Sequence, residues 1–185
     1  MEQVINQTVE VLRRGGVVLY PTDTIWGIGC DARNAQAVEK LYRIKERDRS
    51  KSMLVLVTDN PGLPEYLEAP GNRPTTYILP RERWQALLGE DIAPNLPAAD
   101  GTLGIRMPRH RFCQEVIHRL GAPLVSTSAN LSGRPSPQSY NYIEEELKRR
   151  VDYCVPPLAE FLSGETRGSR IVKVEADGSR TVIRP

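Results

Sequence analysis

The sequence has few of the residues that anchor metals, disulfides or membranes. Its 185 residues include three cysteines and two histidines, and no Cys-x-x-Cys spacing occurs. Cys30, Cys113 and Cys154 are odd in number and widely separated, which indicates free thiols in a reducing compartment. The longest apolar runs, residues 17–19 and 54–57, are too short to cross a bilayer, and no long apolar stretch follows Glu2. We therefore expect a cytoplasmic protein with no signal peptide, no membrane partner and no metal site built from side chains.

The sequence also lacks a large excess of either charge sign, since its formal net charge is only +2. The basic residues are nevertheless clustered. One cluster contains Lys40, Arg43, Lys45, Arg47, Arg49 and Lys51, and a second contains Arg106, Arg109, Arg111 and Arg119. Such runs usually form solvated surfaces. Because both adjoin hydroxyl-rich turns, they also favour a site for an anion.

Several common catalytic motifs are absent or misplaced. The sequence has no GxxxxGK[ST] phosphate loop and no GxSxG nucleophile elbow. Gly27-x-Gly29-x-x-Ala32 matches the dinucleotide pattern GxGxxA, but Pro21-Thr22-Asp23-Thr24 separates it from the preceding strand and no acidic ribose ligand follows. We interpret that match as a coincidence.

Hydrophobic periodicity predicts an α/β chain in which helices and strands alternate. The predicted helices cover residues 4–12, 35–44, 112–120 and 142–151. The predicted strands cover residues 17–20, 53–58, 75–79, 104–107 and 124–127, followed by a hairpin of 171–174 and 180–183 around Asp177-Gly178. The proline-rich stretch 61–80 is typical of an irregular surface excursion. We expect one domain over residues 1–185, with helices packed on a mixed sheet.

Hydroxyl groups and cations gather at the predicted strand ends. The densest run, Ser126-Thr127-Ser128-Ala129-Asn130, continues a buried strand and exceeds what one turn requires. Ligands of open α/β sheets bind at strand ends, so these loops could converge on one concavity. No side chain is an obvious nucleophile, which favours catalysis by positioning and charge stabilisation, as in phosphoryl and nucleotidyl transfer.

Five motifs in order make the chain similar to a known family. They are Tyr20-Pro21-Thr22-Asp23-Thr24-x-x-Gly27-x-Gly29-Cys30-Asp31-Ala32, Lys45-x-Arg47, Thr102-x-Gly104-x-Arg106-x-Pro108, Ser126-Thr127-Ser128-Ala129-Asn130-x-Ser132-Gly133 and Ser169-Arg170-Ile171-Val172. Each motif is weak alone, but together they closely resemble the YrdC-like threonylcarbamoyl-adenylate synthase family over nearly the whole chain.

The resemblance implies a YrdC-like twisted mixed sheet flanked by helices, with a concave basic face. It also implies an enzyme that joins L-threonine, bicarbonate or CO2, and ATP into threonylcarbamoyl-adenylate and releases pyrophosphate. This product begins threonylcarbamoyladenosine modification of tRNA, and a separate complex transfers the group. ATP is then a substrate, Mg²⁺ is expected only from general ATP chemistry, and tRNA and the transfer complex are possible partners.

The resemblance also implies roles for particular residues. Lys45 and Arg47 would be catalytic. ATP would be held by Arg47, Lys51, Thr102, Ser128, Asn130, Ser136 and Arg184. Threonine would be held by Thr22, Thr24, Arg106, Ser126 and Ser169. Asp48 and Ser52 replace prolines usual in the family, which puts the roles of Lys45 and Lys51 in question.

Two other functions are compatible with the same residues. A non-catalytic module that binds double-stranded RNA or tRNA would need cationic surface but not hydroxyls converging on a small ligand. A paralogue could act on another carbamoyl-adenylate. Because Lys45, Arg47, Ser128 and Asn130 occur together, we favour the synthase.

Overall fold

The structure, a computed structural model, describes residues 1–48, 53–58, 64, 67, 73–161 and 167–185. The α-helices are α1 (Glu2–Arg13), α2 (Ala35–Lys45), α3 (Arg81–Leu88), α4 (Arg111–Leu120) and α5 (Glu145–Arg150). The strands are β1 (Val18–Tyr20), β2 (Gly27–Gly29), β3 (Leu54–Leu56), β4 (Thr75–Leu79), β5 (Leu103–Arg106), β6 (Leu124–Ser128), β7 (Tyr153–Cys154), β8 (Arg170–Val174) and β9 (Arg180–Arg184). Short 3-10 turns cover Tyr140–Tyr142 and Ala159–Phe161.

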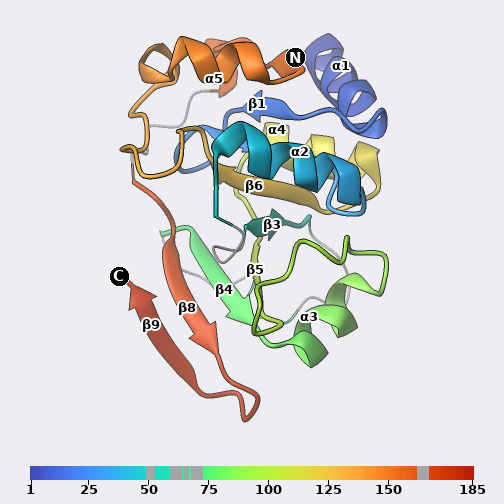
Figure 1. Cartoon of the computed structure of the whole chain (residues 1–185), viewed down its shortest axis with the longest axis vertical. Helices are drawn as coiled ribbons and strands as arrows, with labels where there is room; N and C mark the ends of the chain where they lie inside the picture. Colours follow the sequence, from blue (N-terminus) through green and yellow to red (C-terminus); the bar gives the residue numbers. More distant parts are fainter. Residues whose placement is uncertain (49–52, 59–63, 65–66, 68–72, 162–166) are drawn as a thin grey trace.

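Within the described residues, the strands form one sheet in the order β7-β1-β2-β6-β3-β5-β4-β8-β9. The pairs β1/β7, β3/β5 and β4/β8 are parallel and the others are antiparallel, so the predicted mixed sheet is confirmed. Figure 1 shows α1, α2, α4 and α5 gathered around β1 and β6, whereas α3 lies beside β4 and β5. The helices therefore cover the part of the sheet around β1 and β6, whereas β9 at its edge is exposed.

The sheet is buried on both faces in its β1 region. Val17 and Leu19 pack into a core cluster that includes residues of α2, whereas Val18 and Tyr20 pack into a second cluster with α1 and α4. Alternate side chains of a strand point to opposite faces, so one short strand serves two cores. This explains why residues 17–20 read as an uninterrupted apolar run.

The predicted helix 142–151 is wrong at its start. The chain makes a 3-10 turn over Tyr140–Tyr142, becomes extended at Ile143 (ψ 129°), and enters α5 only at Glu145. Ile143 is buried in the core, and the extended backbone delivers its side chain there. The strand predicted over 53–58 is also shorter, covering Leu54–Leu56.

Besides the two 3-10 turns, three elements in the described residues were not predicted: β2, α3 and the two-residue β7. Gly27 and Gly29 lie within β2 and not between a strand and a helix. Their match to the dinucleotide pattern GxGxxA is therefore a coincidence, as we predicted. A Cβ on Gly29 would lie 1.7 Å from the carbonyl oxygen of Val125, so only glycine permits β2 to approach β6 so closely. Half of the predicted excursion 61–80 lies outside the described residues, and Thr75–Leu79 within it forms β4.

Two other expectations are confirmed. All three cysteines are free. The terminal hairpin forms between β8 and β9, and Gly178 at its turn has φ 88°. Among the described residues, no helix is long and apolar enough to span a bilayer.

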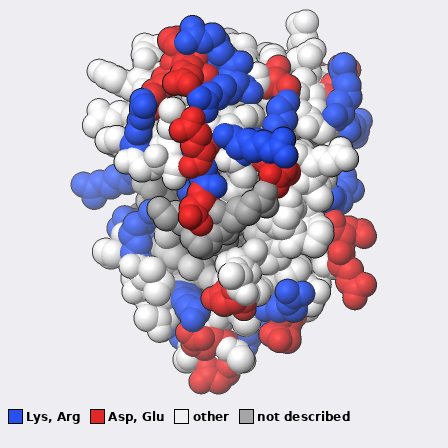
Figure 2. Space-filling view, in the orientation of Figure 1, with Lys and Arg blue, Asp and Glu red and all other residues white. Residues whose placement is uncertain are grey.

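Charges of both signs alternate on the face seen in Figure 2, where blue and red side chains lie next to one another. Lys40 bonds Asp152 at 2.6 Å, and Arg150 pairs with Glu46 at 2.8 Å. Within the two basic clusters of the sequence, Lys45 is buried and Arg49 and Lys51 lie outside the described residues; ion pairs are formed by Lys40, Arg43, Arg106 and Arg119. A wider concave basic face stays a prediction.

Candidate functional site

A cavity of about 360 Å³ opens where the ends of β2, β4, β5, β6 and β8 meet the segment that follows α2. Three arginines and several hydroxyl groups face it, and its described lining includes no carboxylate. The lining residues are Thr24, Ile25, Trp26, Gly27, Arg47, Met53, Leu54, Thr76, Ile78, Gly104, Arg106, Ser126, Thr127, Ser128, Ser136, Gly168, Ser169, Ile171 and Arg184. The structure therefore brings the separate strand-end segments together around one cavity, as we predicted from the sequence.

The loop between β1 and β2 is held by its own threonines. The hydroxyl of Thr22 accepts a hydrogen bond from the backbone N–H of Thr24 (3.0 Å) and donates to the carbonyl of Ile25 (2.8 Å). The two threonine hydroxyls are 3.0 Å apart. Since the single proton of Thr22 goes to Ile25, the hydroxyl of Thr24 is the donor of that pair. Thr22 thus supports the loop, and Thr24 faces the cavity.

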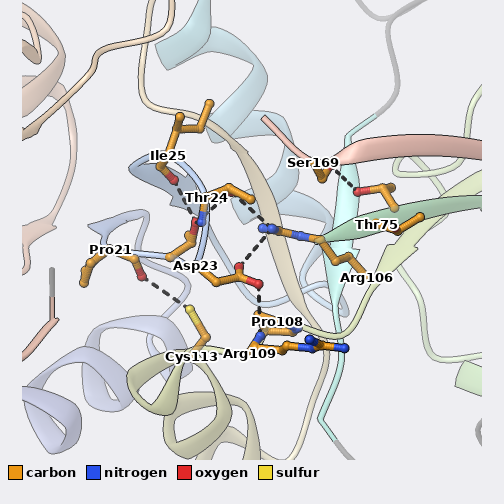
Figure 3. Close-up of polar contacts among 12 residues, drawn as sticks. Pro21, Asp23, Thr24, Ile25, Thr75, Arg106, Pro108, Arg109, Cys113 and Ser169 are labelled. Atoms are coloured by element: carbon orange, nitrogen blue, oxygen red, sulfur yellow. Dashed lines mark hydrogen bonds and ion pairs between the residues drawn. The ribbon is translucent and has the colours of Figure 1, made fainter. Parts of the chain in front are cut away.

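Arg106, at the end of β5, is buried yet retains donor capacity. Its Nη1 group donates to Oδ1 of Asp23 at 2.9 Å and to the hydroxyl of Thr24 at 3.1 Å (Figure 3). Its Nε is buried and has no hydrogen-bond partner among the described residues. Buried donors are normally satisfied, so an orphan at a cavity wall is typical of a group that awaits a ligand.

The partner of Arg106, Asp23, was quoted within a motif but given no role by the sequence analysis. Its second oxygen, Oδ2, accepts a hydrogen bond from the backbone N–H of Arg109 at 3.0 Å. Asp23 is therefore bonded on both oxygens and ties the first loop to the start of the β5–α4 connection. The signal that could have found it is its position between two threonines in a loop that follows a buried strand.

The Lys45-x-Arg47 spacing has a backbone explanation. The helix α2 begins after Asn34, whose side chain accepts from the N–H of Ala37, and ends at Lys45. Glu46 then adopts the left-handed conformation (φ 52°), which reverses the chain. Lys45 is buried against β6, and Arg47, one residue after the reversal, reaches the cavity.

Lys45 is a nearly inaccessible cation. Its Nζ donates to the carbonyl oxygen of Ser128, and its own carbonyl accepts from the N–H of Ser132 (2.9 Å). Burial, together with the nearby charge of Arg47, lowers the pKa of Lys45 to about 7. Burial also lowers the pKa of Arg47. Lys45 therefore fastens the loop after β6 to the end of α2.

The C-terminal half of β6 presents two serines to the cavity, Ser126 and Ser128. Asn130 lies behind them, where its Nδ2 donates to the carbonyls of Leu131 (3.0 Å) and Arg134 (2.7 Å). Its buried Oδ1 has no partner among the described residues. Asn130 thus shapes the loop, and its predicted contact with ATP stays a prediction.

The opposite wall comes from β4, β8 and β9. Thr76 and Ser169, both buried, share a hydrogen bond of 2.7 Å between their hydroxyls. The guanidinium of Arg184 donates to the carbonyl of Ser169, with Nε at 2.9 Å. Thr76 was missed by the sequence analysis, because nothing in the local pattern of β4 indicates which of its two threonines faces the cavity.

The apolar part of the lining was also missed. Trp26 lies at the cavity wall, and its ring packs against Tyr140 with centroids 4.9 Å apart. Met53 and Leu54 face the same space. A wall of this kind suits the flat or methyl-bearing part of a ligand.

The predicted site residues fall into three groups. Thr24, Arg47, Arg106, Ser126, Ser128, Ser136, Ser169 and Arg184 line the cavity. Thr22, Lys45 and Asn130 stand behind the lining and hold it. Thr102 lies outside the lining, where its hydroxyl donates to Asp100 at 2.7 Å, and Lys51 lies outside the described residues.

Comparison with known sequences finds a family model and relatives that match most of the chain. The model of the Sua5/YciO/YrdC family, described as telomere recombination, matches residues 10–185. A threonylcarbamoyl-AMP synthase of Photobacterium profundum is 30% identical over 196 residues, which cover 97% of either chain.

Solved structures share the fold. The structure of P. abyssi Sua5 complexed with L-threonine matches with a TM-score of 0.77 and 24% identity, covering 98% of this chain and 53% of that one. E. coli YciO matches with a TM-score of 0.69 and 26% identity, covering 100% of this chain and 89% of that one. The chain thus spans about half the length of the solved Sua5 chain.

Proposed function

Because this chain belongs to the Sua5/YciO/YrdC family, we propose that it is an L-threonylcarbamoyladenylate synthase, a nucleotidyltransferase acting on threonine, CO2 or bicarbonate, and ATP. The observation that carries the proposal is the single cavity in which Arg47, Arg106 and Arg184 meet the serines and threonines of four strand ends. A carboxylate and a polyphosphate are the two anions that such a set of donors suits.

The chemistry has two steps. The neutral amine of threonine attacks CO2 and loses a proton, which gives a carbamate. A carbamate oxygen then attacks the α-phosphorus of ATP, the bond from that phosphorus to the bridging oxygen breaks, and pyrophosphate leaves. The products are threonylcarbamoyl-AMP and pyrophosphate. Since carbamates and mixed anhydrides decay in water, a recessed site protects them.

The residues divide between the two substrates. Arg106, Thr24, Ser126 and Ser169 would hold threonine, with the carboxylate on Arg106. Arg47, Ser128, Ser136 and Arg184 would hold ATP, and Lys51 and Thr102 stay predictions for the same substrate. Arg47 offsets charge on the departing pyrophosphate, which is stabilisation of charge as it develops. Lys45 would act indirectly, since its bond to the carbonyl of Ser128 holds the end of β6 beside the ATP site.

Magnesium would enter with ATP rather than through a protein cage. Among the described residues, no group of three or more His, Cys, Asp or Glu side chains could hold a metal ion. Asp23, the carboxylate beside the cavity, already accepts from Arg106 and Arg109. Phosphate oxygens and water are the usual ligands of nucleotide-bound Mg²⁺. The transfer complex and tRNA would be downstream partners of the product.

A pyrophosphate-release assay in which each substrate is omitted in turn tests the proposal. We expect release only when threonine, bicarbonate and ATP are all present, with threonylcarbamoyl-AMP detected by mass spectrometry. Release without threonine would indicate another substrate. Salt-sensitive RNA binding without any threonine-dependent release would favour the RNA-binding alternative.

A further inference from the structure

The ion pair between Asp23 and Arg106 connects residues 83 positions apart in the sequence. Both side chains are at least nine-tenths buried, with exposed fractions of 9% and 4%. A guanidinium has five N–H donors in a fixed plane. Where those donors point depends on which of them the protein occupies.

The protein occupies one end of the guanidinium. The two protons of Nη1 are committed, one to Oδ1 of Asp23 and one to the hydroxyl of Thr24. Nε carries its proton without a partner among the described residues, and the remaining N–H groups are on Nη2. Nε and Nη2 together form the edge of arginine that binds a carboxylate through two parallel hydrogen bonds.

Asp23 cannot turn without breaking another contact. Its Oδ2 accepts from the backbone N–H of Arg109, at the start of the segment that leads into α4 (Figure 3). This second bond fixes the plane of the carboxylate, and the carboxylate in turn fixes Nη1. The charge of Arg106 is also balanced before any ligand arrives, so selection of a ligand carboxylate rests on geometry more than on net charge.

We propose that Asp23 is a positioning residue that turns the Nε–Nη2 edge of Arg106 toward the ligand and so confers selectivity for a free α-carboxylate on the amino-acid substrate. The proposal rests on the proposed function, because it takes threonine as the ligand of Arg106. It goes further because it assigns the orientation of Arg106, and with it the selectivity for a carboxylate, to Asp23, which does not line the cavity.

The test compares threonine with L-threoninol, which has an alcohol in place of the carboxylate. In Asp23→Asn we expect the Kd of threonine, measured by calorimetry, to rise at least tenfold and its KM to rise equally. The Ki of threoninol and the KM of ATP should stay within about twofold. A loss of structure around the site would weaken all three ligands together, and equal weakening would therefore overturn the proposal, as would an unchanged Kd for threonine.

Asp31→Asn is the matched control. Asp31 is also buried (7% exposed) and pairs with an arginine, Arg33, at 2.9 Å, but this arginine, unlike Arg106, does not line the cavity. Its variant should bind threonine as the wild type does. If Asp23→Asn does not fold, Asp23→Glu keeps the charge and displaces the acceptor by one methylene, and it should raise the Kd of threonine at least threefold without affecting threoninol.

The two proposals fail in different ways. Threonine binding without threonine-dependent pyrophosphate release by the wild type would overturn the proposed function and leave the role of Asp23 open to the calorimetric test. Pyrophosphate release by the wild type, with threonine and threoninol equally affected in Asp23→Asn, would overturn the role of Asp23 alone. No threonine binding by the wild type would overturn both.

Discussion

Arg106 and Arg119 are both ion-paired arginines, but they lie in opposite environments. The side chain of Arg119, on α4, is 28% exposed and donates to Glu2, Asn6 and Glu115. That of Arg106 is 4% exposed, donates to Asp23 and Thr24, and leaves its buried Nε without a partner among the described residues. Arg119, the more exposed of the two, therefore has more hydrogen-bond partners than Arg106.

The difference separates an arginine that joins two helices from one prepared for a ligand. An exposed ion pair is worth little because water competes for both charges. A buried pair is costly to assemble, and an orphan donor within it adds to the cost. Buried ion pairs with an unpartnered donor persist mainly where function requires them. The unpartnered Nε of Arg106 therefore identifies the site more clearly than the charge of this arginine does.

The largest expected effect is on stability. Arg106→Ala leaves the carboxylate of Asp23 buried without its cation, and we expect a loss of about 3–5 kcal/mol in the free energy of unfolding. Arg119→Ala should cost much less, because water screens its ion pairs with Glu2 and Glu115. Urea denaturation of both variants measures the difference. Equal losses would remove the contrast between the two arginines.

Arg47→Ala extends the comparison to catalysis. The side chain of Arg47 faces the cavity, and its removal should lower kcat by about 10²- to 10³-fold, the usual cost of losing one donor to developing charge. Arg43→Ala is the control, because Arg43 lies in the last turn of α2, just before the segment of Arg47, is exposed, and pairs with Glu39. Steady-state pyrophosphate release measures both variants. A kcat of Arg47→Ala equal to that of the control would exclude Arg47 from the reaction.

Lys45, a second buried cation, gives a pH-dependent prediction. Its folded pKa of about 7 lies below that of an unfolded lysine, so between these values the unfolded chain holds the extra proton. Stability should therefore rise with pH across this window, by up to roughly 1.4 kcal/mol per pH unit. The cost of burying the charge is fully present below pH 7.

Urea denaturation at pH 7, 8 and 9 checks this slope. Lys45→Met should flatten it, whereas Lys40→Met, which alters an exposed lysine of the same helix paired with Asp152, should not. A slope that is the same in wild type and Lys45→Met would show that Lys45 keeps its proton throughout.

The smallest effect is expected at the hydroxyl pair of the opposite wall. Thr76→Val keeps the shape of the side chain but leaves Ser169 without its bond, which should cost about 1 kcal/mol of stability and raise the KM of threonine several-fold. Thr75→Val, one residue earlier on the same strand, alters a half-buried hydroxyl that bonds Arg73. The control should leave the KM unchanged, and a similar KM for both variants would argue against a role of this pair.

Local patterns predicted much of the fold. The apolar runs of β1 and β6 and the stripes of α1, α2 and α4 are properties of neighbouring residues, and the structure has these elements close to the predicted bounds. The helix expected from Tyr142 began late because burial of Ile143 overrode local preference. The strand β2 was missed because two of its three residues are glycines, which are rare in strands. Gly29 is required there because a Cβ would collide with the backbone of Val125 in β6.

The site was predictable in outline only. Hydroxyls and cations at strand ends are visible in the sequence, and their convergence follows from the sheet. That Lys45 would be buried against Ser128, or that Asp23 would bond Arg106, depends on contacts between residues more than 80 positions apart. No local pattern encodes such a contact.

The most direct test is a crystal structure with threonine and a non-hydrolysable ATP analogue bound together. We expect the threonine carboxylate on the Nε–Nη2 edge of Arg106, the phosphates against Arg47 and Arg184, and the amine facing the α-phosphorus with space for the CO2 unit between them. Threonine and nucleotide bound in separate places, or a carboxylate held away from Arg106, would contradict the claim that one cavity joins them.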